Sequence, residues 1–273
     1  MTGRAPGLVV FTDLDATLLD EATYSFEPAR EALAALAEGG IPLVLCSSKT
    51  RAEMERWARS LGASGPLIVE NGGSVLWPDG PGYRVEPLGT PRANLIAALA
   101  DIARETGSSV RGFAGMEAVE VQRLTGLGPS AAREAMAREH DEPFLVDAGD
   151  PAAIADAAGR RGLRVTRGGR FHHLTGPTDK GTAVGVILTS WRAVGRPPRS
   201  VGLGDSANDI SMLEAVDRPI VVPRPGGAPD ADLVRALPGA ELAPAPGPEG
   251  WNAAVLAALH GRRLPAVGTA GRT

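Results

Sequence analysis

The sequence has few of the features that would place it among disulfide-rich, membrane-spanning or nucleic-acid-binding proteins. Cys46 is the single cysteine in 273 residues, so no disulfide can form within the chain. This usage fits a reducing compartment. The apolar stretch that begins at Leu8 is too short for a signal peptide, and no window approaches the length of a membrane span. The net charge of −4 argues against a nucleic-acid partner. Taken together, these features lead us to expect a cytoplasmic protein with neither a nucleic-acid nor a membrane partner.

Lysine is almost absent as well. Of the 28 lysine and arginine residues, only Lys49 and Lys180 are lysines. A compact ammonium group with three donors can act as a point charge between a carboxylate and a phosphate, which a planar guanidinium group does less well. We therefore treat both lysines as candidate functional residues.

Apolar runs and helical patterns alternate in the first 70 residues and again after about residue 180. Continuous apolar strands separated by helices are typical of a parallel sheet that is covered on both faces. Between these two parts, a segment rich in Gly and Pro at residues 77–91 opens a different section of amphipathic helices and strands. We therefore predict an α/β fold, with a Rossmann-like parallel-sheet core formed by residues 1–77 and 176–273 and an inserted α/β cap domain at residues 78–175.

Polar residues collect where the predicted strands end. They are Asp13 and Asp15 after the first strand, Ser47, Ser48 and Lys49 after the second, residues 70–73 after the third, Lys180 at the start of a helix, and Asp205, Asn208 and Asp209 after a late strand. Ligands of open parallel sheets bind at the carboxyl ends of the strands. Each feature alone has an ordinary explanation, since an acid after a strand is more often a helix cap or an Asx turn. Together they predict one site.

The residue types in this set point to a phosphate and a metal ion. Hydroxyl groups, ammonium groups and helix N-termini form phosphate cradles. Asp13, Asp15 and Asp205 offer oxygen atoms to a hard cation such as Mg²⁺, and such an ion would make it tolerable for two carboxylates to stand two residues apart. A dinucleotide-binding oxidoreductase would need a Gly-rich turn after the first strand, and the sequence there is DLDAT instead.

These motifs carry a resemblance to a known family. DLDAT, Ser47, Lys180 and GDSAND resemble the four motifs of the haloacid dehalogenase superfamily of phosphatases, and the section from about 77 to 175 is similar to its α/β cap. More narrowly, FTDLDATLLD, SSKT, VENGG, REHDEPF, GGRFHHL, DKG, GLGDSAND and APGPEGW resemble the family of mannosyl-3-phosphoglycerate phosphatases, over about residues 8–256. The chain departs from the superfamily at Ala16, where glycine is usual. If that position needs a positive φ, alanine costs about 1 kcal/mol of strain.

The resemblance implies a Mg²⁺-dependent phosphatase in mannosylglycerate (compatible-solute) biosynthesis. It would hydrolyse mannosyl-3-phosphoglycerate, a small phosphorylated glycoside, through an aspartyl phosphate on Asp13. The Asp15 side chain would act as acid and base, while Ser47 and Lys180 would stabilise charge on the phosphoryl group. Three alternatives stay open: a glucosyl-3-phosphoglycerate phosphatase, another phosphosugar phosphatase or mutase of the superfamily, and a non-catalytic ligand-binding relative.

The resemblance also implies a ligand set for the metal ion. Asp13, the backbone carbonyl of Asp15 and Asp205 would hold Mg²⁺, and Asp209 with Asn208 would orient the groups around it.

The substrate-binding residues are predicted with an ordinary alternative beside each. Lys49 is placed to bind the glycerate carboxylate, or else it is a surface lysine at a helix start. Asn71 and Gly72 approach the substrate, or else they form a tight turn. Asn208 is predicted to contact the substrate as well. Arg167 in the cap suits a carboxylate, although solvated arginines are the default in so Arg-rich a chain.

Further candidates for substrate contact in the cap are Arg138, Glu142 and Arg170. If their strand is regular, Arg170 and His172 share one face and His173 lies on the other. For the histidines we expect structural or surface roles, because they lack companions for a metal site.

Overall fold

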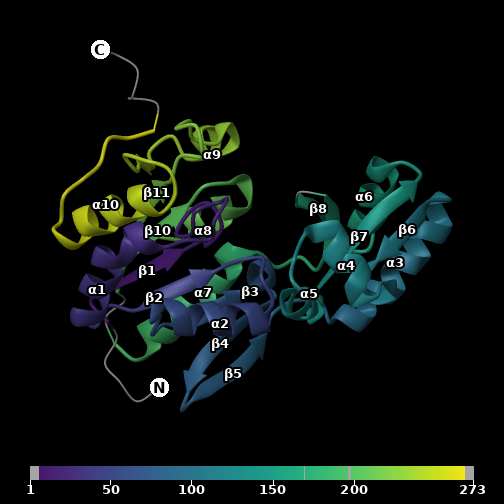
Figure 1. Cartoon of the computed structure of the whole chain (residues 1–273), viewed down its shortest axis with the longest axis horizontal. Coiled ribbons are helices and arrows are strands. Elements are labelled where there is room, and N and C mark those ends of the chain that lie inside the picture. The colour runs from purple at the N-terminus through teal and green to yellow at the C-terminus, as the bar shows by residue number, and fades with distance from the viewer. Residues whose placement is uncertain (1–5, 169, 196–197, 268–273) are drawn as a thin grey trace.

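Two β-sheets organise the chain, and each has its own covering helices (Figure 1). The computed structural model describes residues 6–168, 170–195 and 198–267. The larger sheet has eight strands in the order β12-β11-β10-β1-β2-β3-β4-β5, and the smaller sheet has four in the order β6-β7-β9-β8. No helix within the described ranges is both long enough and apolar enough to cross a lipid bilayer.

The bounds of the elements follow the chain order. The strands are β1 (Leu8–Thr12), β2 (Leu43–Cys46), β3 (Leu67–Val69), β4 (Ser74–Asp79), β5 (Gly82–Pro87), β6 (Ser109–Gly112), β7 (Asp141–Ala148), β8 (Arg164–Gly168), β9 (Phe171–Thr175), β10 (Arg199–Gly204), β11 (Arg218–Val221) and β12 (Glu241–Leu242). The α-helices are α1 (Arg30–Glu38), α2 (Arg51–Leu61), α3 (Arg92–Thr106), α4 (Ala118–Thr125), α5 (Pro129–Met136), α6 (Pro151–Gly159), α7 (Lys180–Ala193), α8 (Ile210–Glu214), α9 (Ala231–Ala236) and α10 (Gly247–Leu259). Short 3₁₀ helices are η1 (Glu27–Ala29), η2 (Glu70–Gly72), η3 (Phe113–Gly115) and η4 (Ala207–Asp209).

The larger sheet is parallel through six of its strands. β1 pairs in parallel with β10 and β2, and the parallel pairing continues to β12 on one side and to β3 on the other. All six strands therefore end at the same edge of the sheet, which is where the predicted site residues follow them. This arrangement confirms the predicted α/β fold with a parallel-sheet core and an inserted α/β cap.

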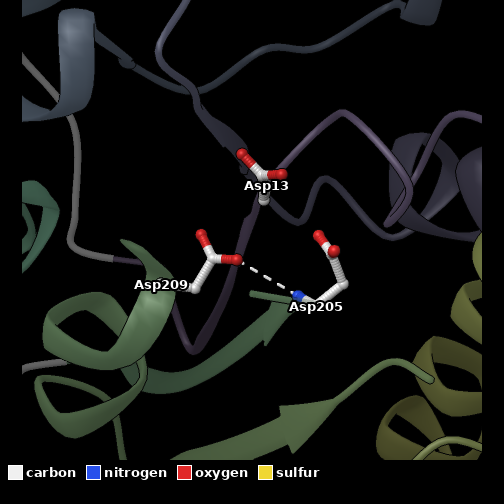
Figure 2. Close-up of side chains that lie close together, drawn as sticks. All are labelled: Asp13, Asp205 and Asp209. Carbon is white, nitrogen blue, oxygen red and sulfur yellow. Dashed lines mark hydrogen bonds between the residues drawn. The ribbon is translucent and has the colours of Figure 1, made fainter. Parts of the chain in front are cut away.

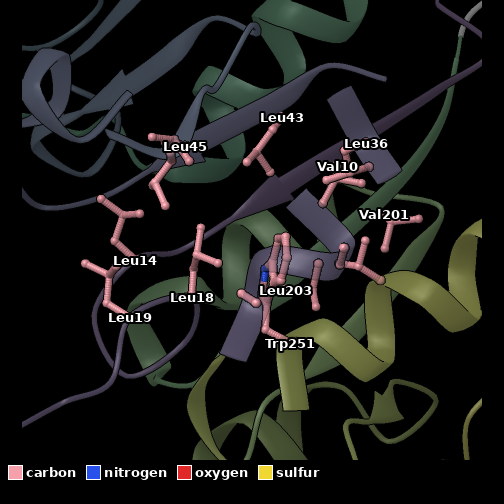
Figure 3. Packing of buried hydrophobic residues seen from close by; sticks show 14 of the residues in the cluster. Val10, Leu14, Leu18, Leu19, Leu36, Leu43, Leu45, Val201, Leu203 and Trp251 are labelled. Carbon is pink, nitrogen blue, oxygen red and sulfur yellow. The ribbon is translucent and has the colours of Figure 1, made fainter. Parts of the chain in front are cut away.

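Each face of the parallel sheet is covered by helices. Successive residues of a strand point to opposite faces, and the buried strands carry apolar side chains on both, so both faces pack against helices. Val10 of β1 packs in the cluster that contains residues of α1, α2 and α10, whereas Val9 and Phe11 pack with residues of α7, α8 and α9. Figure 3 shows the first cluster, in which the Trp251 ring of α10 lies near Leu203 of β10. The two layers of helices fix the strands, and so the loops that follow them.

The cap is a four-stranded antiparallel sheet covered on one face by α3 and α6. Figure 1 shows it beside the core, with α5 on the side that faces the core. The cap boundary expected at residue 78 falls inside the β4–β5 hairpin. Because β5 pairs with β4, and β4 with β3, residues 82–87 extend the larger sheet, so the first connection to the cap comes after Pro87.

Candidate active site

The site begins where β1 ends. The N–H group of Asp13 donates to the carbonyl oxygen of Leu203 at 3.0 Å, so the pairing of β1 with β10 continues to this residue. The hydroxyl of Thr12 donates to the Asp13 carbonyl oxygen at 2.7 Å, and Nε1 of the buried Trp251 donates to the same hydroxyl at 2.9 Å. The backbone that carries Asp13 is therefore held from the sheet and from α10.

Three carboxylates converge at this edge of the sheet (Figure 2). Asp13, Asp205 and Asp209 are all buried, and each offers an oxygen atom that lies within 4.8 Å of those of the other two. Oδ2 of Asp209 accepts the N–H groups of Asp205 and Ser206, each at 3.1 Å, which closes the turn after β10. The hydroxyl of Thr17 donates to Oδ1 of Asp205 at 2.9 Å.

Lys180 joins two of these carboxylates. Its Nζ lies 2.7 Å from Oδ1 of Asp13 and 2.6 Å from Oδ1 of Asp209, and its side chain is 0% exposed. Asp179 caps the first turn of α7 through the N–H group of Thr182 and so places Lys180 at the helix start. Burial alone would lower the pKa of Lys180, but Asp13 and Asp209 outweigh it and raise that pKa.

The acidic groups outnumber the ammonium groups in this cluster. Burial raises the pKa of Asp13 well above its usual value, against the opposing effect of Lys180. Burial, together with the neighbouring Asp209, raises the pKa of Asp205 to about 6. Three close, buried carboxylates with one ammonium group form an oxygen-rich donor set that a hard divalent cation such as Mg²⁺ would neutralise. The residues present fit such an ion.

Asp15 and Lys49 form a pair beside the three carboxylates. Nζ of Lys49 lies 2.8 and 2.7 Å from the two carboxylate oxygens of Asp15, and the Asp15 side chain is 42% exposed. The Tyr24 ring lies 5.4 Å from the same ammonium group. Burial would lower the pKa of Lys49, but Asp15 raises it. The side chain of Asp15 thus binds Lys49 and is not one of the three converging carboxylates.

The loop after β2 carries Ser47. Ser47 is buried, its N–H group donates to the carbonyl oxygen of Ile68 at 3.0 Å, and its hydroxyl accepts the N–H group of Lys49 at 3.3 Å. The loop ends at Thr50, which forms with Glu53 the capping box of α2.

The turn after β3 is more than an ordinary tight turn. Glu70 and Asn71 have φ of 48° and 55°, a region that few residues other than glycine adopt. At Gly72 a Cβ would lie 2.1 Å from the carbonyl oxygen of Asp179, so only glycine allows this approach to α7. The Glu70 carboxylate accepts the N–H groups of Glu139 and His140 at 2.8 and 2.7 Å. The turn therefore ties the core to the cap and to the helix that bears Lys180.

Two hollows meet at this site. A cleft of about 380 Å³ between cap and core is bordered by Asn71, His173, Lys180 and Asn208. A second hollow of about 460 Å³ contains Asp13, Asp15, Asp205 and Arg224. Ser48 and Asn208 border both hollows. A ligand with its phosphate near Asp13 has room to extend toward the cap.

The cap candidates have different surroundings. Arg138 donates to the carbonyl oxygen of Ser48 at 2.9 Å and to Asp141 at 2.7 Å. Glu142 is buried and accepts from Arg92 at 2.6 Å, which is a contact within the cap. Arg167 borders the cleft, although its strand register places it opposite His172, on the other face of the sheet from His173.

The two histidines of β9, His172 and His173, lie on opposite faces of the cap sheet and therefore have different surroundings. Arg170 precedes β9 in an exposed turn. His172 stacks on the Phe144 ring with 5.4 Å between ring centroids, on the face of the cap sheet that α3 and α6 cover. His173 borders the cleft.

Three residues of the site are not among the candidate site residues that the sequence patterns single out. Arg224 lies 3.7 Å from Oδ2 of Asp205, Thr17 binds the same carboxylate, and Trp251 supports the backbone of Asp13. Thr17 is the last residue of the DLDAT motif, so the sequence marks its position although not its bond to Asp205. Trp251 ends the APGPEGW motif, which lies far from Asp13 in sequence, and Arg224 lies in none of the quoted motifs. Only the fold brings these two residues to the site.

Comparison with known proteins identifies the family of the chain. Residues 10–96 match the family described as haloacid dehalogenase-like hydrolase. Proteins named glucosyl-3-phosphoglycerate/mannosyl-3-phosphoglycerate phosphatase from Methanococcoides burtonii and Persephonella marina are each 38% identical to this chain. The matches cover 91% and 93% of this chain and 96% and 97% of the relatives.

Solved structures share the fold. A phosphatase of the haloalkanoate superfamily from Bacteroides thetaiotaomicron has a TM-score of 0.67 at 18% identity, covering 95% of this chain and 97% of that one. A sugar phosphatase of haloacid dehalogenase subclass IIB has a TM-score of 0.64 at 18% identity, covering 92% and 98%. At this identity the likeness shows the arrangement of core and cap, and nothing finer.

Proposed function

Because the chain belongs to the haloacid dehalogenase-like hydrolase family and is a phosphoric monoester hydrolase, we propose that it hydrolyses mannosyl-3-phosphoglycerate to mannosylglycerate and phosphate. The observation that carries the chemistry is the buried group of Asp13, Asp205 and Asp209 with Lys180 between two of them. The substrate class is supported by the two relatives at 38% identity, which are named for it. We place the activity in the cytoplasm, as a step that yields a compatible solute.

Asp13 is the proposed nucleophile. A carboxylate is a weak nucleophile, so the protein's contribution is positioning and charge neutralisation. The backbone of Asp13 is fixed by Leu203 and Thr12, and Lys180 holds one of its carboxylate oxygens. The other oxygen attacks phosphorus and forms an aspartyl phosphate, which water then hydrolyses. The Ser47 hydroxyl and the Lys180 ammonium group donate to the phosphoryl oxygens.

The cofactor we propose is Mg²⁺, held by Asp13, the backbone carbonyl of Asp15 and Asp205, with Asp209 and Asn208 orienting the groups around it. When bound, it would supply positive charge against the phosphoryl oxygens. Lys180 supplies a fixed positive charge at the same place, and Asp209 keeps its ammonium group directed at Asp13.

Asp15 is the proposed acid and base. It protonates the leaving alkoxide of the substrate and later takes a proton from the attacking water. In this structure its carboxylate pairs with Lys49. The glycerate carboxylate of the substrate would compete with Asp15 for the same ammonium group. Asn71, Gly72, Arg167 and Asn208 stay proposed substrate contacts.

Glucosyl-3-phosphoglycerate is the second candidate substrate, because both relatives carry the two sugars in their names. The two compounds share the phosphoglycerate that the proposed contacts at Asp13 and Lys49 would bind. They differ only in the configuration of the sugar.

Phosphate release from a panel of esters tests the proposal. The panel contains mannosyl- and glucosyl-3-phosphoglycerate, 3-phosphoglycerate, mannose 6-phosphate and p-nitrophenyl phosphate, each with Mg²⁺ and with a chelator. We expect the highest kcat/KM for a glycosyl phosphoglycerate, lost with the chelator and restored by Mg²⁺. Hydrolysis of the simple sugar phosphates with no release from either glycosyl phosphoglycerate would overturn the assignment.

A further inference from the structure

His173 of β9 lies on the cap wall of the cleft. Its side chain is 16% exposed, and the cleft it borders also holds Lys180 and Asn208 of the catalytic core. Strand register places Pro143 and Thr166 beside it. An imidazole group in this place faces the non-phosphoryl part of an ester whose phosphate lies at Asp13.

One nitrogen of the ring is already engaged. Nδ1 of His173 lies 2.8 Å from Oδ2 of Asp141, a residue that is only 2% exposed. Nη1 of Arg138 donates to the same oxygen at 2.7 Å and to the carbonyl oxygen of Ser48 at 2.9 Å. The ring is thus anchored through two cap residues to the loop that carries the phosphate-binding Ser47. With Nδ1 engaged, Nε2 is the nitrogen left for a ligand.

The opposite wall offers an acceptor. Asn71 borders the same cleft, and among the described residues its buried Oδ1 has no hydrogen-bond partner. A buried acceptor without a partner costs about 1–3 kcal/mol. A hydroxyl-bearing ligand in the cleft would remove that cost. The cleft therefore has a polar nitrogen on the cap wall and a free carbonyl oxygen on the core wall.

We propose that His173 is a specificity-determining residue, whose Nε2 forms a hydrogen bond with a hydroxyl group of the substrate's alcohol part while Asp141 and Arg138 hold the ring. This inference rests on the proposed function in one respect, since it takes a polyhydroxylated phosphate ester as the substrate. It adds to that function the group that distinguishes such an ester from a plain aryl or alkyl phosphate.

The test compares variants at His173 on two substrates. His173→Asn retains an amide that can donate to Asp141 but has no counterpart of Nε2, whereas the amide of His173→Gln reaches the position of Nε2. The matched control is His172→Asn, because His172 is the neighbouring imidazole on the opposite face of the same strand. The substrates are the best glycosyl phosphoglycerate of the panel and p-nitrophenyl phosphate, whose leaving group has no hydroxyl.

We expect His173→Asn to lower kcat/KM for the glycosyl substrate roughly 5- to 100-fold, the worth of one lost hydrogen bond to a polar ligand. The loss should appear mainly as a higher KM, with p-nitrophenyl phosphate hydrolysed as before and with partial recovery in His173→Gln. The His172→Asn control should hydrolyse both substrates normally. Equal losses on both substrates would assign His173 a structural role and overturn the inference, as would no loss on either.

A failure of the proposed function gives a different result. If the unmodified protein hydrolyses neither glycosyl phosphoglycerate, the same variants are compared on the phosphosugar that it hydrolyses best. A selective loss there still supports the role of His173, and its absence contradicts it. Thermal unfolding of each variant shows whether it is folded, and a His173→Gln protein that is folded but gains nothing over His173→Asn also counts against the inference.

Discussion

Lys180 has no contact with solvent and binds two carboxylates, Asp13 and Asp209. Its position depends on the N-cap of α7 and on the close approach of Gly72 to the Asp179 carbonyl. Substituting a buried charge leaves its partners as uncompensated buried charges, which is more costly than the loss of an exposed ion pair. Stability and catalysis should therefore change together at this residue.

For Lys180→Met we expect kcat to fall about 10²- to 10³-fold, as for the loss of one donor to a transition-state oxygen. We also expect the free energy of unfolding to fall by about 3–5 kcal/mol, because two acids lose their shared cation. Steady-state kinetics and urea unfolding measure the two effects. Arg192→Met, an exposed cation on the same helix, is the control and should change neither. Normal turnover in Lys180→Met would remove this residue from the site.

Ala16 shows a strained backbone at the position where the superfamily usually has glycine. Its φ is 55°, which is the left-handed region. Ala16→Gly should raise the free energy of unfolding by about 0.5–1 kcal/mol through relief of this strain. The reciprocal control is Gly62→Ala, at φ of 65° and with open space around a Cβ, which should lower it by about 1 kcal/mol. Denaturant unfolding of both variants checks the pair, and a destabilised Ala16→Gly would contradict the expectation.

At the scale of elements, the loop between β2 and α2 connects the proposed phosphate site to the cap. The Thr50 hydroxyl donates to the carbonyl oxygen of Glu134 in α5 at 2.8 Å, and Arg138 donates to the carbonyl oxygen of Ser48. The turn after β3 adds the bonds from Glu139 and His140 to Glu70. The cap residues that follow α5 are thus tied to the same loops that carry Ser47 and Asn71.

Arg138→Met should weaken this connection in a measurable way. It leaves the buried Asp141 without its guanidinium partner, so we expect a loss of about 3–5 kcal/mol in the free energy of unfolding. KM for a glycosyl phosphoglycerate should rise more than KM for p-nitrophenyl phosphate, because the cap wall bearing His173 loses the one of its ties to the core that runs through Asp141. Arg56→Met is the control, since Arg56 also bridges core and cap, at Glu134, but is exposed. The same changes in the free energy of unfolding and in KM for Arg138→Met and Arg56→Met would show that the buried contact between Arg138 and Asp141 has no special role.

The elements of the core could be predicted from the sequence because apolar strands and capped helices alternate clearly there. The acids after β1 and β10 are local patterns, and the structure has them at the predicted strand ends. The hairpin β4–β5 was assigned to the cap from residue 78, since Gly and Pro mark a turn but not the sheet that its strands join. Strand pairing is a long-range property that local composition does not contain.

At the scale of the whole molecule, the sequence predicts which strand ends form the site, but it does not predict which side chains of the site contact one another. The parallel sheet brings Asp13, Ser47 and Asp205 to one edge, which the topology alone requires. The pairing of Asp15 with Lys49 and the link from Ser48 through Arg138 to His173 depend on side-chain reach across loops and across the cap. The sequence marks Arg138 as a candidate for substrate contact, but it offers no signal that Arg138 binds Ser48 and Asp141.

Mg²⁺ should stabilise the folded protein, because the three carboxylates converge only in the folded state. At a concentration one hundred times its Kd, a ligand adds about 2.7 kcal/mol. Thermal unfolding with Mg²⁺ and with a chelator measures the effect as a rise in Tm. Asp205→Asn should lose most of the rise, whereas the control Asp232→Asn, at an exposed acid of α9, should keep it. The same rise in both variants would place the ion elsewhere.

The most direct test of the proposed chemistry is to identify the residue that carries the phosphoryl group during turnover. Enzyme mixed with an excess of substrate and Mg²⁺ is quenched in acid within one turnover, digested, and analysed by peptide mass spectrometry. We expect one phosphoryl group on the peptide that contains Asp13, attached to that residue, and neither this adduct nor phosphate release from Asp13→Asn. A phosphoryl group on another residue, or near-normal phosphate release from Asp13→Asn, would contradict the proposed reaction.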